Sequence, residues 1–187
     1  MDKRLKEIKQ IKGAMHSYIY LIYEFVLEAR WNKVLEIGVY RGHSTRAILL
    51  AMSKNKKGTL VSIDILNRDK LLKKWRSYDD LQKHWKFICG DSGLEPTFIA
   101  AKSELEDGEM YDMLFIDGDH RYERVKHDFN KYSELVKPGG VILIHDVTNR
   151  RFGVKEFWPE ITWDKFIIDW GFFGNNVIPG LGLVKKP

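Results

Sequence analysis

The chain has 187 residues, a formal net charge of +5 and 30% charged residues, which is typical of a single globular domain. No apolar run approaches the ~20 residues that span a bilayer, and the amino terminus lacks the apolar core of a signal peptide. The basic residues lie in small scattered clusters, which favours solvated surfaces over nucleic-acid binding. The single cysteine, Cys89, excludes an internal disulfide and fits a reducing cytoplasm, and we expect it to be a buried strand residue.

Apolar residues recur at helical spacing over residues 4–29, and this pattern predicts amino-terminal helices that Gly13 divides in two. Short apolar runs then alternate with further helical patterns. We interpret as strands the runs at residues 34–37, 60–63, 86–89, 113–116 and 141–144. Strands that alternate with helices predict right-handed crossovers and a largely parallel sheet.

The carboxyl-terminal part of the chain predicts one more helix and two more strands. Residues 121–136 carry apolar side chains on one helical face as far as Val136, and Lys137-Pro-Gly-Gly140 is expected to end that helix. Residues 163–168 and 177–184 read as strands that a Gly/Asn/Pro loop joins without a helix. We therefore expect these two strands to pair antiparallel at one edge of the sheet.

Acidic and imidazole side chains gather where two of the expected strands end. Asp117-Gly-Asp-His120 directly follows the fourth apolar run, and His145-Asp146 follows the fifth. Open α/β sheets bind their ligands at the carboxyl ends of the strands, so these residues are candidates for a functional site. His120 and His145 are candidate bases because imidazole titrates near neutral pH, and a purely structural role stays open for each.

A glycine turn joins the first strand to the next helix, with the sequence Glu36-Ile-Gly38-Val-Tyr-Arg-Gly42-His-Ser44. Glycines let the backbone pass close to a ligand, and a helix start offers free N–H groups to an anion. A tight turn that needs glycine for its own geometry explains the pattern equally well. The two glycines are four residues apart and a third is missing, which argues against the dinucleotide fingerprint of a nicotinamide-dependent dehydrogenase.

Two further strand ends carry side chains that suit a nucleoside. Asp64 closes the second strand, where an acid can accept hydrogen bonds from both hydroxyls of a ribose, or can act as a helix cap. Asp91 and Ser92 follow the third strand, where Asp91 could meet an adenine edge and either residue could instead cap a helix.

Four motifs in this order resemble a known family. They are Leu35-Glu-Ile-Gly-Val-Tyr-Arg-Gly-His-Ser44, Phe115-Ile-Asp-Gly-Asp-His-Arg-Tyr122, Val136-Lys-Pro-Gly-Gly140 and His145-Asp-Val147, and the later Gly153-Val-Lys-Glu-Phe-Trp158 is also similar. The family is that of class I S-adenosylmethionine-dependent methyltransferases, most closely methyltransferase family 24, and the resemblance runs from Val34 to Val184. It implies an α/β, Rossmann-like, doubly wound sheet of seven strands, mostly parallel with an antiparallel last strand and preceded by amino-terminal helices.

From the length of the chain we expect a single methyltransferase domain over residues 1–187, with an amino-terminal helical cap over 1–30 and a Rossmann-like core over 31–187. The resemblance assigns the methionine part of S-adenosyl-L-methionine to the glycine turn, the ribose to Asp64 and the adenine to Asp91-Ser92. The cofactor-binding residues that it implies are Glu36, Gly38, Tyr40, Gly42, Ser44, Asp64, Asp91, Ser92 and Asp117.

The resemblance further implies a place for a divalent cation. In related catechol-type O-methyltransferases such an ion lowers the pKa of the acceptor hydroxyl, and Asp117 and Asp146 match two of its ligand positions, which suit Mg²⁺. The third ligand there is an Asn directly after the second Asp, and this chain departs from the pattern with Val147. A related set of these enzymes has an acid where this chain has His145. As a metal ligand, His145 would favour a softer ion than Mg²⁺, and its alternative role is that of a base.

Aromatic side chains near these motifs have two interpretations. Phe152, Phe157 and Trp158 are expected in the core, and walls of an acceptor pocket are the alternative. The aromatic and basic segment 66–85 is also expected to pack into the core, and the alternative is a lid over the cofactor.

Together these patterns predict an S-adenosylmethionine-dependent methyltransferase that methylates an oxygen of a small hydroxylated metabolite, a sugar or a phenol, with Asp117, His120 and His145 as catalytic residues. One alternative is a cofactor-binding module or partner subunit without transfer activity. Another is a nucleic-acid methyltransferase that uses the basic segment 54–76, although the chain lacks the Asn/Asp-Pro-Pro-aromatic motif of base-directed enzymes. A homodimer through the apolar terminal strand is a further hypothesis.

Overall fold

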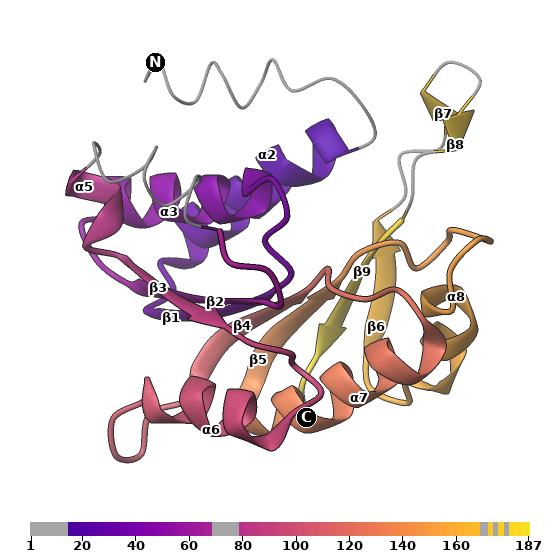
Figure 1. The fold of residues 1–187 in the computed structure, drawn as a ribbon. Helices are drawn as coiled ribbons and strands as arrows, with labels where there is room; N and C mark the ends of the chain where they lie inside the picture. The colour runs from indigo at the N-terminus through magenta and orange to yellow at the C-terminus, as the bar shows by residue number, and fades with distance from the viewer. Residues whose placement is uncertain (1–14, 69–78, 169–171, 174–175, 178–179) are drawn as a thin grey trace.

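The structure is a computed structural model that describes residues 15–68, 79–168, 172–173, 176–177 and 180–187. Its centre is a seven-stranded sheet (Figure 1). In spatial order the strands are β3 (Trp85–Cys89), β2 (Thr59–Asp64), β1 (Lys33–Ile37), β4 (Tyr111–Ile116), β5 (Val136–Ile144), β9 (Leu181–Lys185) and β6 (Lys165–Ile168). A separate small hairpin pairs β7 (Phe172–Phe173) with β8 (Asn176–Val177).

The first five strands are parallel, and β9 runs antiparallel to both β5 and β6. The expected doubly wound α/β sheet with an antiparallel last strand is therefore confirmed. The chain moves outward from β1 to β2 and β3 and then returns to β4 on the other side of β1. This reversal lies between β1 and β4, and in open α/β sheets it marks the crevice where ligands bind.

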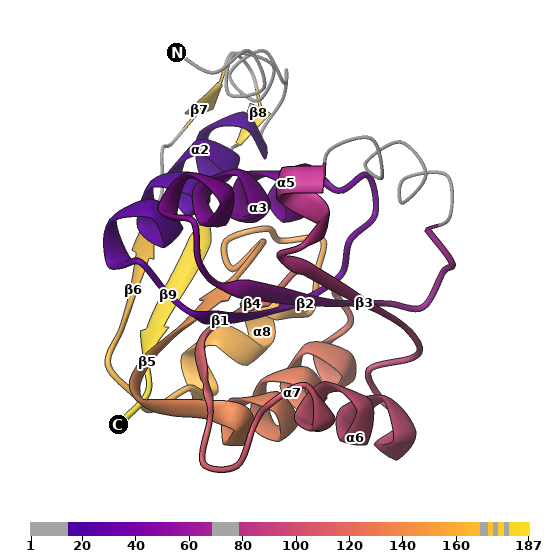
Figure 2. The same cartoon turned by 90° about the vertical axis from the view of Figure 1, so that its left-hand side faces the viewer.

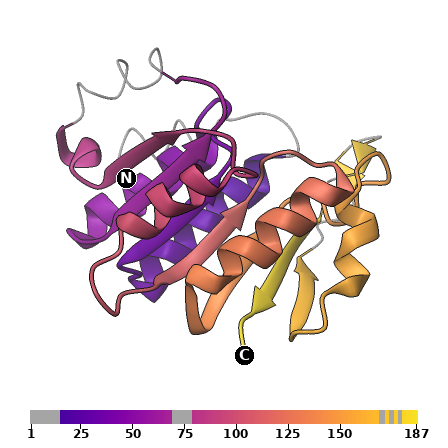
Figure 3. The same cartoon turned by 60° about the horizontal axis from the view of Figure 1, so that its bottom comes forward.

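Helices cover both faces of the sheet (Figure 2). One face carries α2 (Met15–Ala29), α3 (His43–Asn55) and α5 (Asp79–Gln82), and the other carries α6 (Glu95–Ser103), α7 (Tyr122–Tyr132) and α8 (Val154–Phe157), which lie side by side in Figure 3. Short 3₁₀ turns follow α7 and α8, at Ser133–Leu135 and Trp158–Glu160. Among the described residues, no helix is both apolar enough and long enough to cross a membrane.

Alternation along the strands divides the core into two layers. Val34 of β1 packs with α2 and α3, whereas its neighbours Leu35 and Ile37 pack toward α6 and α7. All six residues of β4 are buried, as the continuous apolar run at 113–116 predicted for a strand covered on both faces. Both layers hold the strands firmly, so their carboxyl ends form a fixed frame for the loops that follow.

Three details of the sequence interpretation were wrong. The strand expected over 177–184 begins at Leu181 as β9, because Val177 pairs with Phe172 in the separate hairpin of β7 and β8. The helix expected over 121–136 ends at Tyr132, and Val136 begins β5 instead, because it pairs with Tyr111 of β4. Cys89 was expected to be buried but is exposed, because β3 lies at the sheet edge and Cys89 is its last residue. The division at Gly13 lies outside the described residues.

Candidate active site

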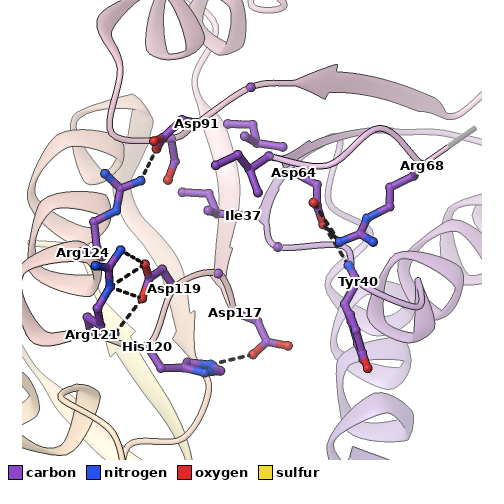
Figure 4. A pocket seen from close by; sticks show the side chains of 16 residues that line it. Ile37, Tyr40, Asp64, Arg68, Asp91, Asp117, Asp119, His120, Arg121 and Arg124 are labelled. Atoms are coloured by element: carbon purple, nitrogen blue, oxygen red, sulfur yellow. Dashed lines mark hydrogen bonds and ion pairs between the residues drawn. The ribbon is translucent and has the colours of Figure 1, made fainter.

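A cavity of about 460 Å³ lies at the carboxyl ends of β1, β2, β3 and β4, at the point where the strand order reverses (Figure 4). Most of the predicted site residues line it. They are Gly38, Tyr40, Asp64, Asp91, Ser92, Asp117 and His120. Five predicted residues lie outside this lining, namely Glu36, Gly42, Ser44, His145 and Asp146.

The glycine turn after β1 packs directly against the end of β4. Gly38 has a φ of +96°, and a Cβ at this position would overlap the carbonyl oxygen of Asp117. Tyr40 also has a positive φ, of +46°, and its side chain is exposed. Positive φ is costly for residues with a Cβ, so Gly38 answers both a backbone and a steric requirement. A residue with a Cβ at position 38 therefore could not lie this close to the end of β4.

Glu36 and Ser44 form a buried hydrogen bond that stabilises the structure around this turn. Glu36 is fully buried and accepts hydrogen bonds from Ser44 Oγ (2.6 Å), Thr45 Oγ1 (2.7 Å) and Ser62 Oγ (2.7 Å). This network ties β1 to the start of α3, which Gly42 precedes with a φ of +71°, and to β2. Burial raises the pKa of Glu36 to about 7, although the three hydroxyl donors oppose the shift.

Asp64 is held by the glycine turn and by an arginine. Its Oδ2 accepts hydrogen bonds from the backbone N–H groups of Val39 and Tyr40, both at 2.9 Å, and its Oδ1 accepts one from Leu66. Arg68 Nη2 lies 2.8 Å from Oδ2 (Figure 4). Burial alone would raise the pKa of Asp64, but Arg68 and the backbone donors lower it. The carboxylate is thus charged and fixed at the cavity wall.

At the far end of the cavity, Asp91 pairs with an arginine from α7. Asp91 Oδ1 accepts a hydrogen bond from the Gly93 N–H (2.8 Å) and forms an ion pair with Arg124 Nη2. These two donors lower the pKa of Asp91. Arg124 and Arg68 both line the cavity, and no motif in the sequence pointed to either of them. Arg68 is 4 residues from its partner Asp64, a spacing that a sequence can suggest, whereas Arg124 is 33 residues from its partner Asp91. Only the pairing of Arg68 with Asp64 could therefore have been suspected from the sequence.

Asp117, His120, His145 and Asp146 form one cluster beside the glycine turn. Asp117 Oδ1 lies 3.2 Å from His120 Nε2 and 3.1 Å from His145 Nδ1. Asp146 Oδ2 lies 3.6 Å from His120 Nε2 and 3.4 Å from His145 Nδ1. The structure therefore brings together the residues that the sequence places at the ends of β4 and β5.

The charges in this cluster are strongly coupled. Burial alone would raise the pKa of Asp117, but the two histidines lower it to about 2. Burial alone would lower the pKa of His145, but Asp117 and Asp146 raise it to about 10. His145 thus keeps its proton in the ligand-free chain, which argues against His145 as the base in that state. Its contacts are not aligned as hydrogen bonds, and its buried Nε2 makes none with the described residues.

Asp146 stands in a strained conformation, with a φ of +64°. Its Oδ1 accepts a hydrogen bond from Asn149 Nδ2 (3.2 Å), a contact that the sequence interpretation missed. Val147, which replaces the Asn of the catechol-type pattern, is buried in the core and has no ligating atom. The amide beside Asp146 therefore comes from three residues further along the chain.

The aromatic residues after Asp146 divide between core and site. Phe157 and Trp158 are buried in the core, as expected. Phe152 is 36% exposed and its ring lies against that of His120, with centroids 4.6 Å apart and planes tilted by 32°, so it borders the cluster. Within segment 66–85, residues 69–78 lie outside the described residues, and Trp85 begins β3 and donates a hydrogen bond to Ser62 Oγ.

Comparison with known proteins shows the same type of domain. A family model described as a methyltransferase domain matches residues 35–147. The uncharacterized protein R132 of Acanthamoeba polyphaga mimivirus is 30% identical over 161 residues, which cover 79% of this chain and 69% of the relative. The uncharacterized protein y4gI of Sinorhizobium fredii is 39% identical over 70 residues, which cover 36% of this chain and 8% of that relative.

Solved structures share the fold over the whole chain. An O-methyltransferase from Bacillus cereus in complex with SAH has a TM-score of 0.74 at 17% identity and covers 100% of this chain and 92% of its own. The O-methyltransferase TomG from Streptomyces achromogenes, involved in tomaymycin synthesis and in complex with SAM, has a TM-score of 0.69 at 17% identity, with coverages of 100% and 91%. At these identities the similarity shows the fold alone.

The Gly38 contact leads to a first prediction. A Gly38→Ala variant should lose at least roughly 2 kcal/mol of stability and lose binding in the cavity, because both its φ and the Asp117 carbonyl oppose a Cβ. Gly108→Ala is the matched control, since Gly108 has a φ of +78° but open space around it, and it should cost about 1 kcal/mol. Urea unfolding of both variants measures the difference, and equal losses would contradict the close contact.

Glu36 leads to a prediction about pH. The folded chain holds a proton on Glu36 up to about pH 7, whereas an ordinary glutamate releases it near 4.5. The folded state therefore binds more protons between these pH values, and the stability that Glu36 contributes is lost as the pH rises through that window. A Glu36→Gln variant cannot titrate, so its Tm relative to the wild type should be higher at pH 8 than at pH 5. A constant difference in Tm across this range would show that the Glu36 pKa is not raised.

Proposed function

Because the chain belongs to methyltransferase family 24 and is an S-adenosylmethionine-dependent methyltransferase, we propose that it transfers the methyl group to a hydroxyl oxygen of a small acceptor. One observation carries this proposal: the cluster of Asp117, His120, His145 and Asp146 lies beside the glycine turn of the same cavity that holds Asp64 and Asp91. Cofactor residues and proton-accepting residues therefore meet at one place.

The cavity offers a separate subsite for each part of the cofactor. We assign the methionine part to the turn at Gly38, the ribose to Asp64 and the adenine to Asp91 and Ser92. The fixed, charged carboxylate of Asp64 is a suitable acceptor for hydrogen bonds from the ribose hydroxyls. It would accept them while it stays in contact with Arg68. Glu36, Gly42 and Ser44 serve this binding indirectly, since they shape the turn from below.

Methyl transfer requires alignment and the removal of one proton. When bound, S-adenosylmethionine would supply an electrophilic methyl group: the acceptor oxygen would form a bond to its carbon while the bond from that carbon to sulfur breaks and leaves its electron pair on sulfur. We assign the acceptor proton to His120, which is 25% exposed and lies next to Asp117. With Nε2 facing Asp117, the lone pair for the acceptor proton would be on Nδ1. His145 stays protonated and balances the two carboxylates.

The same cluster fits a divalent cation. Ligand atoms of Asp117, His120 and His145 lie within 4.8 Å of one another, and Asp146 lies beside them. The buried His145 Nε2 makes no hydrogen bond among the described residues. Because two imidazoles accompany the carboxylates, this set suits a transition-metal ion better than Mg²⁺. A bound ion would lower the pKa of an acceptor hydroxyl, and His145 would then be neutral.

Helix α2 lies on the side of the cluster assigned to the acceptor. Tyr18 of α2 is fully buried and meets His145 edge-on, with ring centroids 5.7 Å apart. Helix α2 packs on α3, which itself begins at the glycine turn. We propose that residues 1–30 form a cap on a single domain of residues 1–187, and that this cap and the loop at Phe152 border a small-molecule acceptor.

The test is a transfer assay with a panel of sugar and phenolic acceptors that follows release of S-adenosylhomocysteine (SAH). The wild type should methylate a hydroxylated acceptor, and a His120→Gln variant should lower kcat about 100-fold at neutral pH because it removes the base. Its affinity for SAH should stay within about twofold, since His120 acts at the acceptor. SAH binding without transfer to any acceptor would support the non-catalytic module, and an unchanged kcat would remove His120 from the mechanism.

Chelation separates the two interpretations of the cluster. Wild-type protein treated with EDTA should regain activity with Mn²⁺ if Asp117, His120 and His145 hold a cation, and His145→Gln should weaken Mn²⁺ binding measured by calorimetry. Activity that EDTA leaves unchanged would contradict the metal and leave His120 alone as the base.

A further inference from the structure

Helix α7 turns one face toward the adenine end of the cavity. Arg124, Asp128 and Tyr132 are spaced four residues apart, which places their side chains in one row on a helix. Arg124 and Tyr132 contact the turn formed by residues 91–93 after β3, and Asp128 lies between them. We call these three side chains the α7 row. Figure 4 shows Arg124 reaching Asp91 from this helix.

The contact between Arg124 and Asp91 depends on a glycine. Arg124 Nη2 pairs with Asp91 Oδ1, which also accepts the Gly93 N–H at 2.8 Å. A Cβ on Gly93 would overlap the guanidinium group of Arg124. Asp91 Oδ2 makes no hydrogen bond within the described part of the chain, so one carboxylate oxygen is fixed and the other is left for a ligand. The two side chains are 28% and 29% exposed, so the ligand can reach them.

The other two residues of the α7 row, Asp128 and Tyr132, lie next to Ser92 in the turn after β3. The Tyr132 hydroxyl is buried and donates a hydrogen bond to the carbonyl oxygen of Ser92 at 3.0 Å. Asp128 is buried near Ser92, and its Oδ2 lies 3.7 Å from where a Cβ on Gly118 would be. Ser92 and Gly118 both line the cavity. The row therefore links the adenine end of the cavity to the segment that carries Asp117.

We propose that the α7 row, with Arg124 as its principal member, positions Asp91 to accept a hydrogen bond from the exocyclic amino group of adenine and so makes the cavity selective for that base. This inference rests on the proposed assignment of adenine to Asp91. Hypoxanthine has a carbonyl oxygen where adenine has the amino group, and a fixed carboxylate oxygen would repel it. Arg124 is a positioning residue, because it acts on the ligand through Asp91.

The experiment compares two ligands by calorimetry: SAH and S-inosylhomocysteine, in which hypoxanthine replaces adenine. The wild type should bind SAH much more tightly. Arg124→Gln should weaken SAH binding at least about tenfold and reduce the preference for adenine about fivefold or more, because Asp91 is no longer fixed. Lys126→Gln is the matched control on the same helix, since Lys126 pairs with Glu160 outside the cavity lining, and it should leave both affinities unchanged.

A second variant distinguishes loss of the contact between Arg124 and Asp91 from misfolding of the Arg124→Gln variant. Gly93→Ala should reproduce the Arg124→Gln effect, because it displaces only the end of a flexible side chain and leaves the fold intact. Combining the two changes should add little, since both remove the same contact. Rescue by Arg124→Lys should be partial, because an ammonium group keeps the charge but loses the planar fork.

The outcomes are distinct. An Arg124→Gln variant with wild-type affinity and wild-type preference for adenine would overturn the inference. A variant that binds SAH more tightly would also overturn it, since Arg124 would then block Asp91 rather than position it. A folded wild type that binds neither ligand would overturn the proposed cofactor site itself, and the inference with it.

Discussion

The contact between the first glycine turn and the end of β4 is the constraint on which the site depends. Gly38 approaches the carbonyl group of Asp117 so closely that no side chain fits between them. Because of this contact, the turn assigned to the methionine part of the cofactor lies beside the Asp117 carboxylate. The reversal of strand order between β1 and β4 creates the crevice. Because Gly38 has no Cβ, the turn after β1 can contact the backbone at the end of β4 across this crevice.

Much of the fold could be predicted because the central strands are short and mostly apolar, and because a Gly, an acid or the His145-Asp146 pair closes or follows each of the strands β1 to β5. The errors fall where tertiary pairing decides. Val136 has a helical pattern in the sequence, but pairing with Tyr111 places it at the start of β5. Cys89 follows apolar neighbours, but the edge position of β3 leaves it exposed. Local pattern shows that a strand exists and does not show which strand lies at the edge.

The site could be predicted only in part, for a similar reason. Carboxylates at strand ends are visible in a sequence, since strand order brings those ends together. Their partners are not visible: Arg124 reaches Asp91 across 33 residues, and Asn149 contacts the Asp146 side chain within a turn that the hydrogen bond from the Asn149 N–H to the Asp146 carbonyl closes. The burial of Glu36 beneath the turn likewise needed the packing of α3 on β1 and β2.

The most direct test of this account is calorimetric titration of the purified protein with SAH, beside an Asp64→Asn variant. We use Asp107→Asn, a change of an exposed loop acid, as the control. We expect micromolar binding by the wild type and by the control, and binding at least about tenfold weaker in Asp64→Asn, because the ribose loses a charged acceptor. A folded wild-type protein that does not bind SAH, or an Asp64→Asn variant that binds as tightly as the wild type, would contradict it.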